Sequence, residues 1–476
     1  MPVPADAAEA VIAEAEREVR NAARKQKRKA AAAEKRRRKQ EDRAAGAAEQ
    51  AGRRRAKEER QREEGEKALA ALLERSVMLA AASGGSLLSC FRLVPDPRSR
   101  RGRRHSLPCI LALVTAALLS GQTLLEDVTA WISHADPEIL AAAGARRGRD
   151  GRLAAPHGKT VTRVLGMLGA QALADAAARY LAAALPPGPV RFPVAGPVLL
   201  PSLNCDGKEI RGATAADGTV PFLLSGAVDG VVIAEREIGA KTNEIPEIGP
   251  MLLSLSEHAP LAGRVITADA LHTQRRLAKL ICEQLLAHYV LTVKDNQKGL
   301  HAALAGLNWA RARRHVTRDH GHGRDETRTH LVMDAPASVK GLFPHVRQIA
   351  RVTRDVTRVT RSRTGKTRAP GLKITHETVY IVTSLTAREA APKHIAAYVR
   401  GHWGIENKVH WVRDVTLRED PSRVSAGSRP RVLATLRNLA MGLIRQAGHD
   451  AIAGTIRQAE YDKALLLAIL RLTPAL

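Results

Sequence analysis

Two short stretches decide the fold of this chain, PVLLPSLNCD at residues 197–206 and RVITAD at residues 264–269. Each is an apolar run that ends in a carboxylate, Asp206 or Asp269. Short apolar runs bounded by turn residues are typical of buried strands. We therefore expect two buried strands, each of which delivers an aspartate at its carboxyl end.

The segments around these two strands alternate between strand and helix patterns. Residues 222–228 and 231–238 are expected to form a hairpin across Asp229-Gly230, a favourable turn pair. Strand four, at 264–268, lies between expected helices at 243–255 and 274–286, and strand five follows at 288–293. This order, β-β-β-α-β-α-β, predicts an α/β fold with a ribonuclease-H-like sheet. Its first and fourth strands are parallel neighbours, so Asp206 and Asp269 should lie side by side where ligands of open α/β sheets bind.

The charge balance points to a polyanionic partner. The 476 residues include 75 Lys and Arg against 48 Asp and Glu, a formal net charge of +27. Because 45% of the residues are hydrophobic, the chain can build a core, and wholesale disorder is excluded. A charge this positive is unusual for a metabolic enzyme and favours nucleic acid as the partner.

The cysteine spacing and the hydropathy of the sequence indicate where in the cell the protein is located. The four cysteines form no C-x-x-C pair, which argues against a disulfide scaffold or a structural zinc site. The most apolar stretch, 107–119, is shorter than the roughly 20 residues of a membrane span. The charged, Ala-rich N-terminus has no signal-peptide core. We expect a cytoplasmic, nucleoid-associated protein without membrane contact.

Composition divides the chain into segments. The first, residues 1–76, is rich in Ala, Glu, Lys and Arg without an apolar seam, and predicts a basic arm that is partly helical or disordered. The others are a small all-helical DNA-binding or associated domain at 84–186, the first part of the core at 195–307, a β-rich insertion at 308–385, the helical completion of the core at 386–447 and a C-terminal helix at 448–476. Within them we expect helices from residue 107 and at 125–134, 160–184 and 431–446, and insertion strands at 324–333, 346–352 and 376–384.

A third carboxylate is expected from a later helix, and Glu406 in GHWGIENKVHW (401–411) supplies it. Five blocks then follow one another: CDGK (205–208), EIGAKTNE (237–244), ITADALH (266–272), VKDNQ (293–297) and residues 402–420. In this order they resemble a DDE transposase of bacterial insertion sequences, more narrowly the ISAs-type branch of the IS-four group. The resemblance runs from about Asp96 to about Arg445.

The resemblance implies a site, a cofactor and partners. Asp206, Asp269 and Glu406 match the DDE triad, which in that family holds two Mg²⁺ ions on a ribonuclease-H-like fold, with Mn²⁺ as a substitute. Such a metal pair activates a water or a 3′-hydroxyl and stabilises the leaving oxygen of a phosphodiester. The implied partners are DNA, as terminal inverted repeats and target duplex, and a second copy of the chain in a synaptic homodimer.

The sequence departs from the group's pattern around Glu406. That pattern has Tyr seven residues before the Glu, Arg four before and Lys seven after, where this chain has Val399, His402 and Arg413. The departure concerns the phosphate contacts and leaves the triad intact. The residues expected to contact DNA are Lys208, Lys294, Asn296, His402, Trp403, Asn407, Arg413 and Arg437.

Two sets of residues around Glu406 have alternative interpretations. His402, Glu406 and His410 lie at i, i+4 and i+8 on one helical face, a geometry that can hold Zn²⁺, although neither Asp motif would take part. Trp403 and Trp411 fit burial in the core, which we favour because tryptophan is usually largely buried. The alternative for them is stacking on an extruded base.

Three functions compete on this evidence. The leading hypothesis is a transposase that cuts DNA at the ends of its element and transfers the 3′-hydroxyl strands to a target. A metal-dependent nuclease on the same fold would cleave without joining. A non-catalytic DNA-binding relic would be expected to have lost part of the triad, and all three residues are present.

Deleting residues 1–76 should weaken binding to specific and random duplexes alike. Each neutralised phosphate contributes about −0.9 to the slope of log affinity against log salt, so the loss of the clustered Arg and Lys should flatten that slope by a few units. Salt titrations of DNA binding by the full and truncated chains check this. Loss of discrimination for the element's own ends with an unchanged slope would instead make the arm a specificity element.

Overall fold

The computed structural model describes residues 85–185, 197–214, 218–239, 244–321, 324–360 and 371–472, together with scattered residues before residue 61. The chain divides into two units, Met1–Ala71 and Leu72–Leu476. The few described residues of the first unit, such as Lys27 and Arg60, are helical and exposed. The predicted arm therefore lies largely outside the described residues, and all that follows concerns the second unit.

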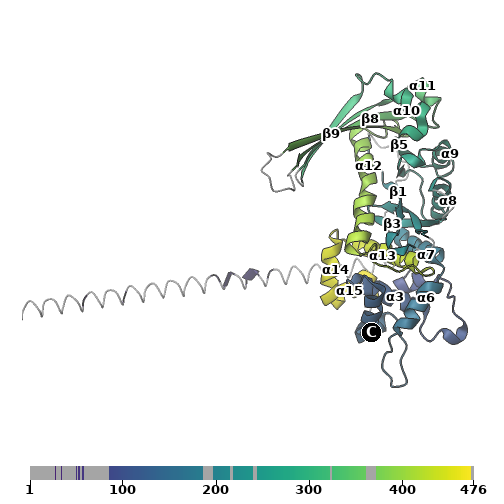
Figure 1. The fold of residues 1–476 in the computed structure, drawn as a ribbon, viewed down its shortest axis with the longest axis vertical. Helices are drawn as coiled ribbons and strands as arrows, with labels where there is room; N and C mark the ends of the chain where they lie inside the picture. Colours follow the sequence, from purple (N-terminus) through teal and green to yellow (C-terminus); the bar gives the residue numbers. More distant parts are fainter. Residues whose placement is uncertain are drawn as a thin grey trace, which may run out of the picture. The chain divides into compact units, whose positions relative to one another are not determined.

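A nine-stranded mixed sheet forms the centre of this unit (Figure 1). The strand order is β3-β2-β1-β4-β5-β9-β8-β7-β6. The strands that build the first half are β1 (Ser202–Glu209), β2 (Phe222–Val228), β3 (Val231–Ile238), β4 (Val265–Ala268) and β5 (His288–Val293). Strands β1, β4 and β5 are parallel, whereas β2 and β3 run antiparallel to their neighbours.

The predicted order of elements is confirmed in this half of the sheet. Strands β2, β3 and β5 have the expected bounds, and β4 and the helix α8 (Glu244–Ser256) begin one residue late. Asp229 and Gly230 both have positive φ, 49° and 81°, as a type I′ turn requires. The local apolar pattern and the turn pair were therefore sufficient to place these elements.

Strand β1 differs from the expected strand at 197–205. It starts at Ser202 and continues through Asp206 to Glu209, so Asp206 lies within the strand and not after it. The reason is that β1 has two partners of different length: its pairing with β4 ends at Cys205 opposite Ala268, whereas its pairing with β2 continues to Glu209. Asp206 is thus fixed on one side by β2 and open on the side where β4 has ended.

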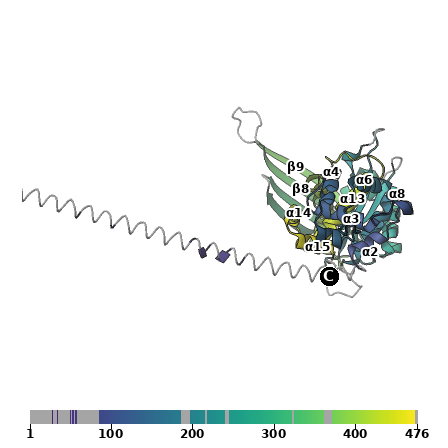
Figure 2. The same ribbon diagram turned by 90° about the horizontal axis from the view of Figure 1, so that it is seen from below.

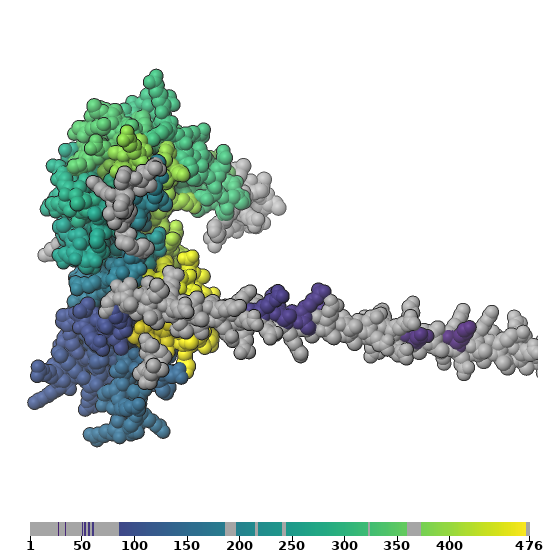
Figure 3. Space-filling model, turned by 180° about the vertical axis from the view of Figure 1, so that it is seen from behind, coloured from purple at the N-terminus to yellow at the C-terminus, as the bar shows by residue number. Residues whose placement is uncertain are grey.

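The β-rich insertion continues the same sheet. Strand β9 pairs antiparallel with β5, and the outer strands follow it in hairpin order. The strands are β6 (Arg313–Gly321), β7 (Arg324–Asp334), β8 (Gln348–Thr360) and β9 (Gly371–Thr383). The sequence did not predict β6, because RRHVTRDHG has a single aliphatic residue. Strands β8 and β9 are the longest described strands, 13 residues each, and with β7 and β6 they project from the rest of the sheet (Figures 1 and 2). This projecting part is green in Figure 3.

The region before the sheet is helical. Its helices are α2 (Leu87–Arg92), α3 (Leu107–Leu119), α4 (Leu125–Ser133), α5 (Pro137–Ala142), α6 (Gly158–Met167) and α7 (Ala170–Ala183). The single helix expected at 160–184 is two helices, because Leu168 is extended, with ψ 140°, and Gly169 starts the next helix. Helix α7 contacts β3 and α13, so these helices share the sheet's core. Among the described helices, none has the length and apolarity of a membrane span.

Four helices follow the insertion: α12 (Pro392–Ile405), α13 (Arg429–Gln446), α14 (Ile452–Tyr461) and α15 (Lys463–Leu470). Helix α12 contacts β1, β4 and β5 and lies across the sheet on the side away from α8 and α9 (Arg275–Lys279) (Figure 1). It continues into π-helical turns at Glu406–His410 and Val412–Thr416. Because α12 crosses both Asp-bearing strands, its C-terminal end delivers Glu406 to them.

Candidate active site

Asp206 and Asp269 lie beside each other at one edge of the parallel strands. Cys205 pairs with Ala268 in the β1–β4 ladder, and each aspartate is the next residue along its strand. The side chain of Asp206 is 26% exposed and that of Asp269 is 46% exposed. One oxygen of Asp269 accepts a bond of 3.3 Å from the backbone N–H of His272, which fixes its direction. The predicted neighbourhood of the two carboxylates is confirmed.

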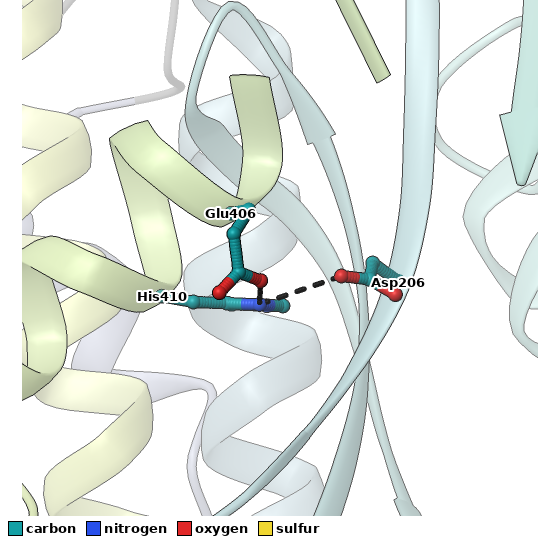
Figure 4. Close-up of side chains that lie close together, drawn as sticks. All are labelled: Asp206, Glu406 and His410. Atoms are coloured by element: carbon teal, nitrogen blue, oxygen red, sulfur yellow. Dashed lines mark hydrogen bonds and ion pairs between the residues drawn. The ribbon is translucent and has the colours of Figure 1, made fainter. Parts of the chain in front are cut away.

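Glu406 and His410 approach Asp206 from the helix (Figure 4). Nδ1 of His410 lies 3.2 Å from a carboxylate oxygen of Glu406 and 3.5 Å from one of Asp206. The ligand atoms of these three residues all lie within 4.8 Å of one another. Glu406 is 69% exposed, whereas the imidazole of His410 is only 4% exposed. The site therefore joins a strand and a helix that are distant in sequence.

The electrostatics of the site fit a divalent cation. Burial raises the pKa of Asp206 to about 6, and the negative charges of Asp269 and Glu244 act in the same direction, while His410 opposes them. A set of carboxylates that repel one another is relieved by a cation held between them. The oxygen-rich donor set of Asp206, Asp269 and Glu406 suits Mg²⁺ or Mn²⁺.

Two further residues at this edge were not assigned a role from sequence. Glu244 begins α8, and its carboxylate packs so closely on Gly207 that a Cβ there would lie 2.6 Å from it. Nε2 of the fully buried His272 lies 3.0 Å from Glu244 and 3.9 Å from Asp269. Both residues stand in the quoted blocks EIGAKTNE and ITADALH, which were the available signal.

His402 does not belong to the His410 cluster. Its Nδ1 lies 3.2 Å from the hydroxyl of Thr267, which in turn donates to Asn204. Burial lowers the pKa of His402 to about 4. Within the described residues, the convergent group contains Asp206 in place of His402, so the alternative zinc set of His402, Glu406 and His410 is not assembled.

Three residues expected at DNA are engaged in internal ion pairs. The ammonium group of Lys208 lies 2.7 Å from the carboxylate of Asp414, and its side chain is 8% exposed. Arg413 and Arg437 are buried and both pair with Glu419. The cationic groups of all three residues pair with carboxylates of the protein. We therefore correct their expected role from phosphate contact to internal ion pairing.

Of the other expected contacts, His402 is largely buried, whereas Lys294, Asn296, Trp403 and Asn407 lie on the surface. Asn296 donates to the backbone oxygen of Ala270 beside the site, and Asn407 donates to that of Trp403. Trp403 is 46% and Trp411 54% exposed, so the favoured expectation of core burial is wrong for both.

A groove of about 410 Å³ opens beside Asp269, between α12 and the insertion strands. Trp403 lies in it, and the guanidinium groups of Arg328 and Arg354 lie over the Trp403 ring at 5.2 and 5.0 Å from its centre. The groove is lined by apolar and by charged side chains. The apolar ones include Val352, Val379, Ala396 and Ala397, and the basic ones are Lys294, Arg328, Arg354, Lys393 and Arg400, of which Arg328 and Arg354 pair with Glu326 and Arg400 with Asp319.

Two known families match parts of this chain. Residues 88–181 match the family described as DDE_Tnp_1-associated, and residues 227–443 match the family described as Transposase DDE domain. Residues 227–443 are a transposase DDE domain, and a DDE-associated domain precedes it. The second match includes Asp269 and Glu406. Asp206, on β1, precedes the first matched residue, 227.

Two curated relatives of this chain come from Escherichia coli. "Putative transposase YncI" of strain O157:H7 is 26% identical over 392 residues, which cover 80% of this chain and 92% of the relative. "H repeat-associated putative transposase YhhI" of strain K12 is 26% identical over 278 residues, covering 56% of this chain and 70% of the relative. A solved piggyBac transposase synaptic complex with hairpin DNA is 12% identical, with a TM-score of 0.39, and covers 76% of this chain and 71% of its own.

Proposed function

We propose that this protein is a DDE transposase that cuts DNA at the ends of its own element and joins the 3′-hydroxyl strands to a target duplex. The observation that carries the proposal is that the β1–β4 register places Asp206 next to Asp269, while a crossing helix brings Glu406 and His410 to Asp206. The supporting features are the basic charge of the chain and the groove beside Asp269. We also propose that the chain belongs to the ISAs-type branch of the IS-four group and that it associates with the nucleoid.

The three carboxylates would hold two divalent ions, and bound Mg²⁺ or Mn²⁺ supplies charge that activates the attacking oxygen and stabilises the leaving one. The protein's contribution is to fix the direction of each carboxylate. The β1–β4 register fixes Asp206 relative to Asp269, and the N–H of His272 orients Asp269. The crossing of α12 over the sheet brings in Glu406.

We place the DNA strand next to the carboxylates in the groove of Trp403. Its apolar side chains suit a base or sugar, and its arginines and lysines suit phosphates. The basic loop Arg100–Arg104 and the helices at 84–186 supply a second surface, because Arg100, Arg101, Arg103 and Arg104 are all exposed. We assign that surface to the terminal inverted repeats, bound by a homodimer.

Replacing Trp403 by Ala should weaken binding of a single-stranded end by about 10-fold or more, since stacking on an aromatic ring contributes roughly 1–3 kcal/mol per base. Fluorescence anisotropy with a labelled oligonucleotide measures this. Trp411→Ala is the matched control, because Trp411 is also exposed but lies outside the groove. Equal losses in the two variants would remove Trp403 from the strand path.

The identity of the metal can be tested by exchange of ions. Mg²⁺ and Mn²⁺ should support cleavage and joining, whereas Ca²⁺ should support DNA binding without chemistry because its looser coordination misplaces the reacting groups. Cleavage assays after chelation and re-addition of each ion check this. Activity restored only by Zn²⁺ would contradict an oxygen-ligated site.

A nuclease without joining activity is the second candidate. It would use the same carboxylates, so the cleavage assay alone does not separate it from the transposase. Incubation with pre-cut ends and a target plasmid does: the transposase forms joined products, and the nuclease leaves the ends free. Binding of the ends without cleavage or joining would favour the non-catalytic relic.

A further inference from the structure

We propose that His410 is a direct ligand, through Nδ1, of the divalent ion that Asp206 and Glu406 hold. The consequence is a site with one nitrogen ligand that binds Mn²⁺ more tightly than Mg²⁺. This inference rests on the proposed metal-dependent function and adds a residue outside the acidic triad. The sequence had placed His410 beside Glu406 only as part of the alternative zinc set with His402.

The geometry of His410 suits ligation. Neighbouring ligands of an octahedral ion at about 2.1 Å lie about 3 Å apart. Nδ1 of His410 is 3.2 Å from the oxygen of Glu406 and 3.5 Å from that of Asp206. In Figure 4 the same ring nitrogen faces both carboxylates. Three donor atoms from two elements therefore surround one position.

A hydrogen bond alone accounts less well for this arrangement. The imidazole is 4% exposed, and its Nε2 has no partner among the described residues. If Nδ1 carries a proton, it donates that proton in a hydrogen bond to one of the two carboxylates, and the other carboxylate receives no hydrogen bond from the ring. If Nδ1 is unprotonated, three electron-rich atoms face one another, and a cation between them relieves the repulsion. A shared metal ion satisfies all three atoms at once.

The nitrogen ligand makes the two sides of the site unequal. On the Asp269 side, the described ligands are carboxylate oxygens, which suit Mg²⁺. On the Glu406 side, His410 adds an imidazole, which suits transition ions better than it suits Mg²⁺. We therefore expect the preference for Mn²⁺ to depend on His410.

The experiment titrates the full chain with Mn²⁺ and records electron spin-echo envelope modulation, which detects ¹⁴N bound to Mn²⁺. The wild type should show imidazole coupling, and His410→Ala should lose it together with about 10-fold in Mn²⁺ affinity by calorimetry, equivalent to about 1.4 kcal/mol. Mg²⁺ affinity should change much less. His394→Ala is the matched control: like His410 it is a buried histidine, and it lies in α12, about 18 Å from Glu406 along the helix at 1.5 Å per residue.

The outcomes separate this inference from the proposed function. Bound Mn²⁺ without ¹⁴N coupling in the wild type, or coupling that persists in His410→Ala, overturns the role of His410 and leaves metal-dependent cleavage standing. Absence of Mn²⁺ binding in the wild type counts against both. Thermal unfolding monitors the buried substitution. If His410→Ala fails to fold, His410→Gln takes its place, and ¹⁵N-labelling of histidine in the wild type shows whether the coupled nitrogen belongs to a histidine.

Discussion

Replacing Asp206 by Asn, Asp269 by Asn or Glu406 by Gln is expected to lower the rate of DNA-end cleavage by about 10³-fold or more. Each change removes one negative charge from the metal site and leaves the size of the side chain nearly unchanged. Charge on the metals contributes several kcal/mol to the transition state, and each 1.36 kcal/mol is tenfold in rate. The measurement is a single-turnover cleavage assay with a labelled duplex that carries the element's end.

Binding of the same duplex should survive these substitutions, because the proposed strand contacts lie in the groove and on the basic loop. Asp334→Asn is a suitable control, since this carboxylate is 74% exposed and lies at the end of β7, away from the described site. Its cleavage rate should equal that of the wild type. A triad variant that cleaves at the wild-type rate would exclude that residue from the site.

Replacing Glu419 by Gln is expected to lower the free energy of unfolding by roughly 3–5 kcal/mol, the cost of breaking a buried ion pair by removing one partner. Both oxygens of Glu419 are used: one accepts from Arg413 at 2.6 and 2.9 Å, and the other from Arg437 at 3.4 Å. Burial alone raises the pKa of Glu419, but Arg413 and Arg437 lower it below its usual range. The carboxylate is therefore ionised at neutral pH, and Gln would leave two buried cations without their anion.

The effect should be large because Arg437, which Glu419 holds in place, also donates to the backbone oxygen of Thr123. This bond connects α13 to the helices before the sheet. Chemical denaturation followed by circular dichroism measures it. Glu138→Gln is the control, since Glu138 is 65% exposed and pairs with Lys463 on the surface, where ion pairs contribute little. A loss below about 1 kcal/mol for Glu419→Gln would show that the arginines find other partners.

The sequence by itself determined the parallel strands, the β2–β3 hairpin and the neighbourhood of Asp206 and Asp269. These features are local: short apolar runs specify buried strands, and Asp229-Gly230 specifies the turn between two of them. Strand order then follows from the few topologies that short, right-handed connections allow. Glu406 was assigned to the site through the resemblance of residues 402–420 to the transposase family. The helical pattern alone does not predict which strand the helix will cross.

Tertiary structure alone decided which charged and aromatic side chains face the site. Lys208, Arg413 and Arg437 look like DNA contacts in the sequence, but Lys208 pairs with the distant Asp414, and Arg413 and Arg437 are buried with Glu419. Trp403 is exposed because its helix lies beside a groove and not under the sheet. His410 lies next to Asp206 because helix α12 crosses β1. These two segments are distant in the chain, and the local pattern of neither predicts the contact.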